Sequence, residues 1–272
     1  MATKIEHILL IGCEGFIGTS LKEILLNYNY GVIHHDIRDE VNAHDIFSEF
    51  LERDINNADI VIHLAAETSV EGSFKNPAQH YITNTMGTAR VAYLCQKYHK
   101  KLIFPSTGAW YFPELSPYAK SKYLAEEIVK GIMDKTPVTI LRLFNVFGPN
   151  MNPNSGSIMY NFLTDKEIVV YGSGEQTRDF IHVRDVCEII KAAISPKWNS
   201  KIVEVGMGQE YTINYVAELF AHFRKKKIVY HEATKREIKW SIANTQMLKT
   251  LYKKKLTTDL EKDIEELVNA TI

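Results

Sequence analysis

Cysteine is scarce in this sequence: Cys13, Cys95 and Cys187 lie far apart and form no C-x-x-C pair. An odd number at such spacing predicts neither a disulfide framework nor a zinc site, so we expect no bound metal and a reducing compartment. Proline, with 8 residues, and glycine, with 14, are too rare for a collagen-like or low-complexity chain. The composition therefore indicates a globular protein.

An excess of charge of one sign is also missing, because 32 Lys and Arg residues face 33 Asp and Glu residues, a formal net charge of −1. Such a chain has no general attraction to nucleic acid or to an anionic membrane, so we expect small-molecule partners. The sequence has no run of about 18 apolar residues that would span a bilayer. It also shows no apolar N-terminal segment of the length that directs secretion, and we expect a cytoplasmic protein.

Short apolar segments alternate with segments of helical periodicity, which predicts an α/β fold with a Rossmann-type doubly wound parallel sheet. The regular alternation of apolar and helical segments ends after Pro149, where a loop rich in Asn and Ser begins. We therefore expect a dinucleotide-binding domain at 1–148 that also includes about 181–206, and a smaller C-terminal substrate-binding domain at 149–180 and 207–272. The expected strands are 8–11, 32–36, 59–64, 101–104, 138–144 and 201–205, and the expected helices are 19–27, 43–53, 77–97, 116–133 and 183–194.

Three glycines, Gly12, Gly15 and Gly18, stand three residues apart between the first expected strand and the first expected helix. Glycines at this spacing let the backbone turn tightly and approach a pyrophosphate. The start of the following helix offers unpaired N–H groups and a partial positive charge to that anion. The segment therefore predicts a dinucleotide-binding loop.

Asp36 ends the second expected strand, where a carboxylate accepts hydrogen bonds from the hydroxyl groups of the adenosine ribose. A carboxylate there also repels the 2′-phosphate of NADP, and Glu14 in the loop adds to this repulsion. Arg38 works in the opposite direction, because a guanidinium can pair with such a phosphate. On balance the sequence predicts NAD as the cofactor, with NADP as the less favoured alternative.

Tyr118 and Lys122 form a Y-x-x-x-K pair, which on a helix places both side chains on one face. There the ammonium would favour the phenolate and lower the pKa of the tyrosine, making Tyr118 a candidate base. Thr107, at the end of the strand before this helix, would form a hydrogen bond with the substrate hydroxyl that Tyr118 deprotonates. The chain holds a second such pair, Tyr93 and Lys97, but it precedes a strand, and we expect Tyr93 to be a packing residue.

Taken together, these residues resemble the extended short-chain dehydrogenase/reductase family, the nucleotide-sugar epimerases and dehydratases, over essentially the full length. The resemblance implies that the cofactor contacts Gly12, Gly15, Phe16, Ile17, Gly18, Asp36, Ile37, Arg38, Leu64, Ala65, Ala66, Asn84, Tyr118 and Lys122. It also implies that Asn145 and Arg178 hold the substrate diphosphate, with Tyr171 near the nucleotide base and Arg236 as a second arginine at the diphosphate. The motifs that carry it are Gly12–Gly18, 63–66, 84–88, Thr107 with Tyr118 and Lys122, 142–149 and 171–180.

The chain departs from the family pattern in two respects. The segment between Tyr111 and Tyr118 is shorter than family members usually have, and one strand–loop unit is missing before Asp59, so loops that shape sugar specificity are trimmed. Family dehydratases carry an acidic residue beside the catalytic Thr, whereas here Gly108 and Ala109 follow Thr107. Neither side chain transfers a proton, which argues against dehydration.

We therefore predict an NAD-dependent 4-epimerase with Thr107, Tyr118 and Lys122 as catalytic residues and a nucleotide-diphosphate sugar, first of all a UDP-sugar, as substrate. Two alternatives remain: a reductase that acts on a 4-keto nucleotide sugar with NAD(P)H, and a non-catalytic dinucleotide-binding protein. The family commonly forms homodimers through the Tyr–Lys helix and the helix before it. An apolar stripe at Leu124, Ile128, Ile132 and Met133 would serve as this dimer face, or would face the sheet instead.

Overall fold

The computed structural model describes residues 6–38, 45–233 and 238–271. The chain divides into two compact units. Unit 1 comprises Met1–Arg142 and Cys187–Val203, and unit 2 comprises Leu143–Val186 and Glu204–Ile272. Across the described ranges, no helix combines the length and the apolar character needed to cross a bilayer.

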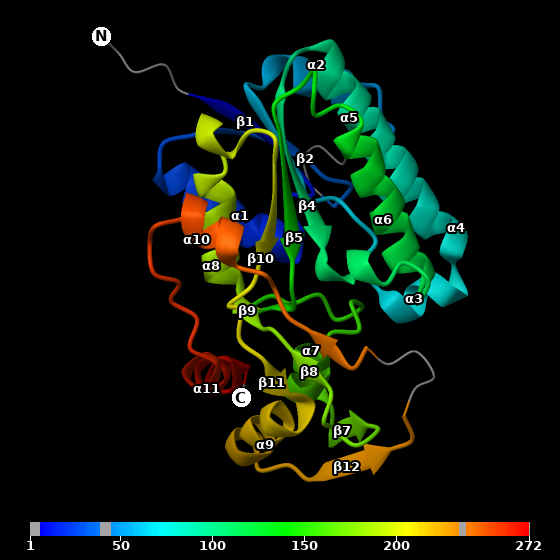
Figure 1. The fold of residues 1–272 in the computed structure, drawn as a ribbon, viewed down its shortest axis with the longest axis vertical. Coiled ribbons are helices and arrows are strands. Elements are labelled where there is room, and N and C mark those ends of the chain that lie inside the picture. The colour runs from blue at the N-terminus through cyan, green and yellow to red at the C-terminus, as the bar shows by residue number, and fades with distance from the viewer. Residues whose placement is uncertain (1–5, 39–44, 234–237, 272) are drawn as a thin grey trace. The chain divides into compact units, whose positions relative to one another are not determined.

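Unit 1 is built on a six-stranded sheet with the order β10-β5-β4-β3-β1-β2 (Figure 1). The pairings of β1 with β2 and β3, and of β3 with β4, are parallel. This sheet confirms the predicted α/β class with a doubly wound parallel sheet. The strands are β1 (His7–Ile11), β2 (Gly31–His35), β3 (Ile60–His63), β4 (Lys101–Thr107), β5 (Val138–Leu143) and β10 (Lys201–Val205).

Helices cover both faces of the sheet, as its apolar strands require (Figure 1). Helices α1 (Phe16–Asn27) and α8 (Val183–Ala192) lie on one face. Helices α2 (Phe50–Asn57), α5 (Thr88–Lys97) and α6 (Pro117–Lys130) lie on the other. The remaining short elements of unit 1 are α3 (Val70–Lys75), α4 (Pro77–His80), the π-helix η1 (Tyr81–Gly87) and the 3₁₀-helices η2 (Gly108–Tyr111) and η3 (Pro196–Trp198).

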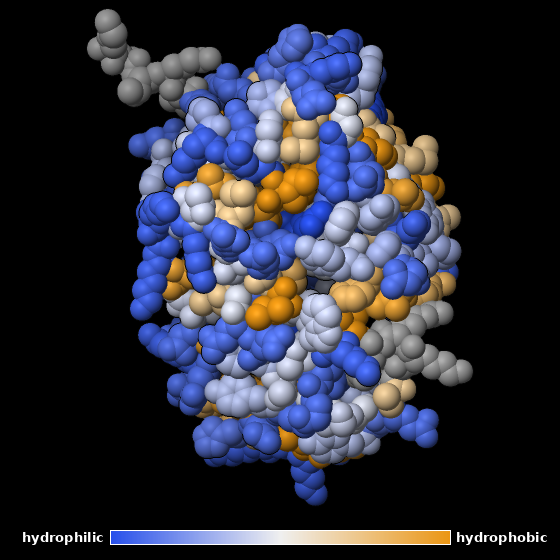
Figure 2. Space-filling model, viewed as in Figure 1, coloured by the Kyte–Doolittle hydropathy of each residue, from blue (hydrophilic) through white to orange (hydrophobic). Residues whose placement is uncertain are grey.

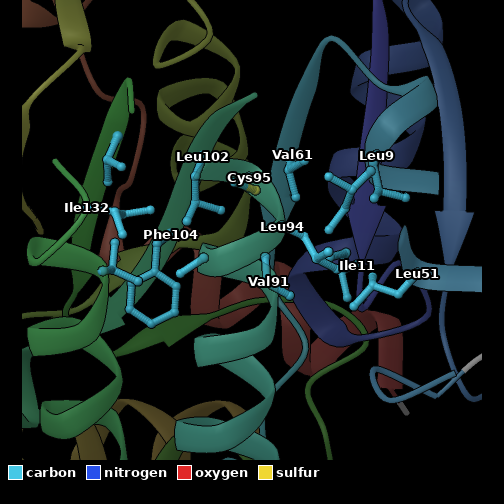
Figure 3. Packing of buried hydrophobic residues seen from close by; sticks show 14 of the residues in the cluster. Leu9, Ile11, Leu51, Val61, Val91, Leu94, Cys95, Leu102, Phe104 and Ile132 are labelled. Carbon is cyan, nitrogen blue, oxygen red and sulfur yellow. The ribbon is translucent and has the colours of Figure 1, made fainter. Parts of the chain in front are cut away.

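One hydrophobic core cluster of unit 1 lies between the sheet and the helices α2, α5 and α6. Side chains of a strand alternate between the two faces, so Leu9 and Ile11 of β1 point into this cluster together with Leu102 and Phe104 of β4. Figure 3 shows them meeting apolar side chains of α5, among them Val91. Burial of this continuous apolar layer fixes the strand ends on which the candidate site is built.

Two predicted helices differ in the structure. The helix predicted at 43–53 begins only at Phe50 and continues to Asn57. Its apolar spacing misled the prediction because Ile46, which lies in the turn before α2, reaches the same core cluster as Leu51. The helix predicted at 77–97 consists of three successive helical segments, α4, η1 and α5, with the π-helix in the middle.

Unit 2 consists of short strands and helices. Its strands form three small sheets with the orders β11-β8-β13, β12-β7 and β6-β9. The carboxylate of Asp185, near the start of α8, accepts hydrogen bonds from the backbone N–H and hydroxyl groups of Thr257 and Thr258, which ties the segment before the last helix to α8. The elements are β6 (Val146–Phe147), α7 (Ile158–Thr164), β7 (Ile168–Tyr171), β8 (Thr177–Arg178), β9 (Ile181–His182), β11 (Tyr211–Thr212), α9 (Ile213–Arg224), β12 (Ile228–His231), β13 (Trp240–Ser241), α10 (Gln246–Leu251) and α11 (Leu260–Thr271).

Candidate functional site

The glycine loop forms the tight turn between β1 and α1. Gly12 has a φ of +89°, and a Cβ atom placed there would lie 2.5 Å from the backbone nitrogen of Ala65. A Cβ atom on Gly18 would collide with the carbonyl oxygen of Gly12. At the start of α1, Gly15 has an extended conformation, and no side chain of the described residues caps the helix there. The first N–H groups of α1, from Phe16 and Ile17 onward, are therefore arranged to receive an anion.

Asp36 follows β2 and is buried beside the loop. Its carboxylate accepts hydrogen bonds from the backbone N–H of Glu14 at 2.9 Å and from the backbone N–H of Arg38 at 2.9 Å. The Arg38 guanidinium also approaches the carboxylate, with Nε at 3.4 Å, and the adjacent Ile37 is exposed. Asp36 thus orients the glycine loop as well as being the candidate acceptor for ribose hydroxyl groups.

Cys13 lies within the loop and is fully buried. Burial, reinforced by the nearby carboxylates of Asp36 and Glu14, raises the pKa of its thiol to about 12. The thiol is therefore neutral at physiological pH and is not a nucleophile. Glu14 itself is held by an ion pair with Lys22 at 2.6 Å.

The segment after β3 contains Leu64, Ala65 and Ala66 and lies beside the glycine loop. The backbone N–H groups of Leu64 and Ala65 both donate to the carbonyl oxygen of Ile11, at 2.8 and 2.9 Å. These hydrogen bonds bring the end of β3 to the end of β1, the edge at which doubly wound folds bind their ligands.

Asn84 of η1 joins this edge to α6. Its side-chain oxygen accepts from the backbone N–H of Glu67, and its amide group donates to the carbonyl oxygen of Glu67 and to the hydroxyl of Ser121. The Ser121 hydroxyl in turn donates to the carbonyl oxygen of Tyr118 at 2.8 Å. Asn84 is fully buried, so its position in this structure is that of a support for the backbone on either side.

Helix α6 positions the Tyr–Lys pair. The helix begins where it does because Ser116 caps it, its hydroxyl accepting from the backbone N–H of Ala119, and because Pro117 fits the first helical position. Tyr118 is half-buried in the first turn. Lys122 is buried one turn later, where its Nζ atom donates to the carbonyl oxygen of Pro105 in β4 at 2.9 Å.

Thr107 is the last residue of β4 and lies next to the Tyr–Lys pair. Its hydroxyl accepts from the backbone N–H of Ala109, which caps η2, and it forms a side-chain hydrogen bond with Tyr118. The structure thus brings Thr107, Tyr118 and Lys122 together from the consecutive elements β4, η2 and α6. A hydroxyl group, a phenol and an ammonium in this arrangement can transfer a proton to or from a substrate hydroxyl.

The sequence predicted that Lys122 lowers the pKa of Tyr118, and the structure differs from this prediction. Burial raises the pKa of Tyr118 above its usual value, and only the hydrogen bond with Thr107 opposes this effect. Burial also lowers the pKa of Lys122 to about 8. The lysine therefore does not by itself lower the pKa of the tyrosine here, because its ammonium is bound to a backbone carbonyl and is itself poorly solvated.

The alternative pair, Tyr93 and Lys97, has no such surroundings. Tyr93 is exposed on α5, so the prediction that it packs in the interior is wrong. Lys97 forms an ion pair with Glu52 at 2.6 Å, far along the helix from the edge of the sheet that carries Thr107. The preference for Tyr118 over Tyr93 as the candidate base therefore rests on position in the fold.

A buried ionic group that the sequence did not predict lies beneath the Tyr–Lys pair. The carboxylate of Glu126, one turn beyond Lys122, accepts from the guanidinium of Arg142 at 2.6 Å and from the Ser106 hydroxyl at 2.6 Å. The same guanidinium lies 3.6 Å from the ring centroid of Trp110 in η2. The spacing of four residues from Tyr118 through Lys122 to Glu126 was the signal in the sequence that would have found it.

Three of the predicted substrate residues lie in unit 2. Asn145 donates to the carbonyl oxygen of Asp179 at 2.9 Å. Arg178 donates to the carbonyl oxygens of Thr177 and Ile238, both at 2.7 Å. Asp179 is fully buried and accepts from three backbone N–H groups, those of Met207, Gly208 and Ala243. Asn145 and Arg178 are therefore set in a rigid backbone framework.

Tyr171 ends β7 and is exposed, with its ring edge-on to His231 at 5.7 Å. Its ring is therefore accessible to a ligand and is not part of the core of unit 2. The fourth predicted substrate residue, Arg236, lies outside the described residues.

Comparisons with known proteins agree on one family. The model of the NAD dependent epimerase/dehydratase family matches residues 8–206. A Methanocaldococcus jannaschii protein, whose proposed activity is UDP-glucose 4-epimerase, is 31% identical over 79% of this chain and 81% of its own length. The UDP-N-acetyl-alpha-D-glucosaminuronate decarboxylase of Bacillus cytotoxicus is 30% identical over 78% of each chain. The structure of a UDP-glucose 4-epimerase from Thermotoga maritima, with UDP-glucose, superimposes with a TM-score of 0.86 at 28% identity and covers 97% of both chains.

Proposed function

Because this chain belongs to the NAD dependent epimerase/dehydratase family, we propose that it is a nucleotide-sugar 4-epimerase. The observation that carries the proposal is the group of Thr107, Tyr118 and Lys122 at the carboxyl end of β4. Gly108 and Ala109 stand beside it, where an acid for dehydration would be needed. The group is equipped to move the proton of a sugar hydroxyl and lacks a neighbouring side chain for a further elimination.

The family match confirms the resemblance drawn from the motifs, and NAD, the predicted cofactor, is the cofactor for which the family is named. The residues present fit this group. Gly12 and Gly18 permit a turn that no side chain would allow, and the uncapped start of α1 faces the loop with its N–H groups. Asp36 supplies a carboxylate at the end of β2 for the ribose hydroxyls.

When bound, NAD supplies the acceptor and donor of a hydride at C4 of the sugar, and its positively charged ring favours the Tyr118 phenolate. Tyr118 takes the proton of the 4-hydroxyl and later returns it. Thr107 holds the same hydroxyl through its own hydroxyl group. Lys122, when protonated, supplies a positive charge on the same side of α6 as the phenolate, and burial lowers the pKa of this lysine to about 8.

We assign the nucleotide-diphosphate end of the substrate to unit 2, following the prediction of a substrate-binding domain. Arg178 presents a guanidinium on β8 that suits phosphate oxygens, and Asn145 presents an amide. The exposed ring of Tyr171 offers a stacking surface for a base. The named relatives act on or bind UDP-sugars, which supports a UDP-sugar as the first substrate to test.

The experiment is proton NMR of the purified protein, without added cofactor, with a panel of UDP-, dTDP- and GDP-hexoses, hexuronic acids and N-acetylhexosamines. We expect the anomeric signal of the C4 epimer to appear in one sample and to be absent with the Tyr118→Phe variant. Unchanged spectra after addition of NAD would overturn the epimerase proposal.

One further outcome of this experiment, and one additional assay with NADPH and a 4-keto nucleotide sugar, identify the alternatives. Release of CO₂ from a UDP-hexuronic acid would identify a decarboxylase, an activity that the Bacillus cytotoxicus relative makes relevant. Stoichiometric consumption of NADPH with a 4-keto sugar would identify a reductase, for which Arg38 beside Asp36 is the observation in its favour.

We also propose that the protein is a homodimer, with a dimer face different from the predicted stripe. Of the four residues of that stripe, Ile128 on α6 and Ile132 and Met133 just after it pack against the core cluster, which supports the alternative that these three face the sheet. Exposed apolar side chains instead follow η1 and α5, at Ile82, Met86 and Tyr93, and Figure 2 shows apolar surface at the edge of the molecule where α5 lies. Light scattering of the wild type and of a Met86→Glu variant tests this face, since a monomeric wild type would refute the dimer.

A further inference from the structure

The face of α6 that carries the Tyr–Lys pair continues deeper into unit 1. Tyr118, Lys122, Glu126 and Lys130 follow one another at intervals of four residues and therefore lie on one side of the helix. Glu126 is fully buried and Lys122 nearly so. Burying a carboxylate and an ammonium one helical turn apart costs free energy of folding unless the two charges attract each other or are neutralised by further partners.

Glu126 does have further partners, and they come from three elements. Arg142 at the end of β5 donates to its carboxylate at 2.6 Å, Lys130 lies at 3.1 Å, and Ser106 of β4 donates at 2.6 Å. Ser106 is the residue directly before Thr107. Glu126 therefore fixes the end of β4 against α6 at the place where Thr107 and Tyr118 must meet.

Lys122 depends on the same strand and on the same carboxylate. Its Nζ atom donates to the carbonyl oxygen of Pro105 and lies 4.5 Å from the ring centroid of Phe104. Burial lowers the pKa of Lys122 to about 8, and the negative charge of Glu126 acts against this effect. Two further titratable groups lie near Lys122 and are neutral: Tyr118, whose pKa burial raises, and His63 of β3, whose pKa burial lowers to about 3.

We propose that Glu126 is a positioning residue that keeps Lys122 charged and holds the end of β4 in place for the proton transfer of the proposed function. The proposal rests on that function for its link to turnover, while the effect of Glu126 on Lys122 is a property of the protein alone. Because Glu126 lies behind Lys122 on α6, with its carboxylate bound to Arg142, Lys130 and Ser106, it acts through Lys122 and is not itself a catalytic residue.

The direct test measures the protonation of Lys122 by NMR of protein labelled at the lysine ε-carbons, with the Lys122 signal assigned by its loss in Lys122→Arg. Removal of a negative charge disfavours an ammonium, so we expect the titration midpoint of Lys122 to fall in Glu126→Gln. At about 6 Å, the spacing of side chains four residues apart on a helix, and an effective dielectric constant of about 20, the shift is about one to two pH units.

Lys130→Met supplies a change of opposite sign. It removes a positive charge from the same face of α6, so the midpoint of Lys122 should rise. A raised midpoint shows that charge on this face of α6 sets the protonation of Lys122, and an unchanged midpoint overturns the proposal. If Glu126→Gln does not fold, Ser106→Ala removes the hydroxyl that joins Glu126 to β4 and should lower kcat; a wild-type kcat would overturn the positioning role. Asp263→Asn is the matched control, because it removes a buried carboxylate paired with Arg184 in unit 2 and should leave the midpoint unchanged.

The link to function is tested by the pH dependence of kcat with the substrate identified by NMR. The alkaline limb should move to lower pH in Glu126→Gln by the same amount as the Lys122 midpoint, with little change in KM. A folded Glu126→Gln protein with the midpoint and the alkaline limb of the wild type would overturn the proposal. A shifted midpoint in a protein that epimerises none of the sugars would leave the role of Glu126 toward Lys122 standing and would refute the proposed function alone.

Discussion

Two glycines of the loop, Gly12 and Gly15, should respond differently to the same small substitution: one through stability and the other through NAD binding. A Cβ atom on Gly12 would lie 2.5 Å from the nitrogen and 2.8 Å from the Cα atom of Ala65, and both are backbone atoms that move only with β3. The φ of +89° at Gly12 is also unfavourable for alanine. A Cβ atom on Gly15 would have its nearest neighbours at 3.2 Å, the carbonyl oxygen of Gly12, and at 3.5 Å, the Arg38 guanidinium.

The expected magnitudes can be derived from these distances. A left-handed conformation costs an alanine about 1–2 kcal/mol, and forcing an extra carbon into a packed contact costs typically about 1–3 kcal/mol more. Gly12→Ala should therefore lower the free energy of unfolding by about 2–5 kcal/mol. Gly15→Ala has no backbone penalty, and at the start of a helix the change from Gly to Ala costs no more than about 1 kcal/mol. For Gly156→Ala, where φ is +71° and no atom lies within 4 Å, only the backbone penalty remains.

The assay combines urea unfolding of the three variants with calorimetric titration of NAD. Gly12→Ala should lower the free energy of unfolding, and its NAD binding should weaken because the loop is destabilised. Gly15→Ala should remain stable but bind NAD more weakly, because a side chain at the second glycine prevents the backbone from approaching the pyrophosphate. Equal unfolding free energies for Gly12→Ala and Gly15→Ala, or unchanged NAD affinity in a stable Gly15→Ala, would refute the reasoning.

Three further predictions concern the Tyr–Lys pair and unit 2. Tyr118→Phe should reduce kcat at least about 100-fold, since it removes the group that transfers the proton, while calorimetry should show NAD binding of the wild-type strength. The activity should fall as the pH rises through about 8, because the ammonium of Lys122 is required and is lost above its lowered pKa; a rate that still increases beyond that pH would contradict this role. The carboxylate of Asp185 accepts hydrogen bonds from donors of Thr257 and Thr258. Asp185→Asn should therefore lower the free energy of unfolding, measured by urea denaturation, by about 2–4 kcal/mol. A loss below about 1 kcal/mol would show that other contacts hold the segment.

The sequence predicted the parts of unit 1 in which local chemistry and fold agree. Gly12 and Gly18 stand where only glycine fits, and Ser116 with Pro117 begins α6 close to the predicted start. The order of strands and helices could be predicted from apolar runs separated by helical periods. These sequence patterns are local, and the structure forms the turns and helices that they predict.

Other features depended on contacts that no local pattern reveals. The buried Ile46 belongs to a turn, yet its spacing from Leu51 resembles that of a helix, so the predicted boundary of α2 was wrong. Tyr93 was expected to be a packing residue and is exposed, because the side of α5 that faces the sheet carries Val91 and Leu94. The apolar stripe at the end of α6 had two possible partners in the sequence, and Ile128, Ile132 and Met133 pack against the core cluster.

The geometry of the Tyr–Lys pair also explains how one family accommodates several reactions. Thr107 and Lys122 are held by backbone contacts, those of Ala109 and Pro105, so under the proposed function the groups that oxidise a sugar at C4 are positioned by the protein itself. The fate of the oxidised sugar depends on the groups beside C4: a carboxylate at C5 can leave as CO₂, and an acid next to Thr107 can begin an elimination. With Gly108 and Ala109 directly after Thr107, these two positions supply no acid for elimination. Under the proposed function, substitutions at Tyr171 or Arg178 should change which sugar reacts before they change the chemistry at C4.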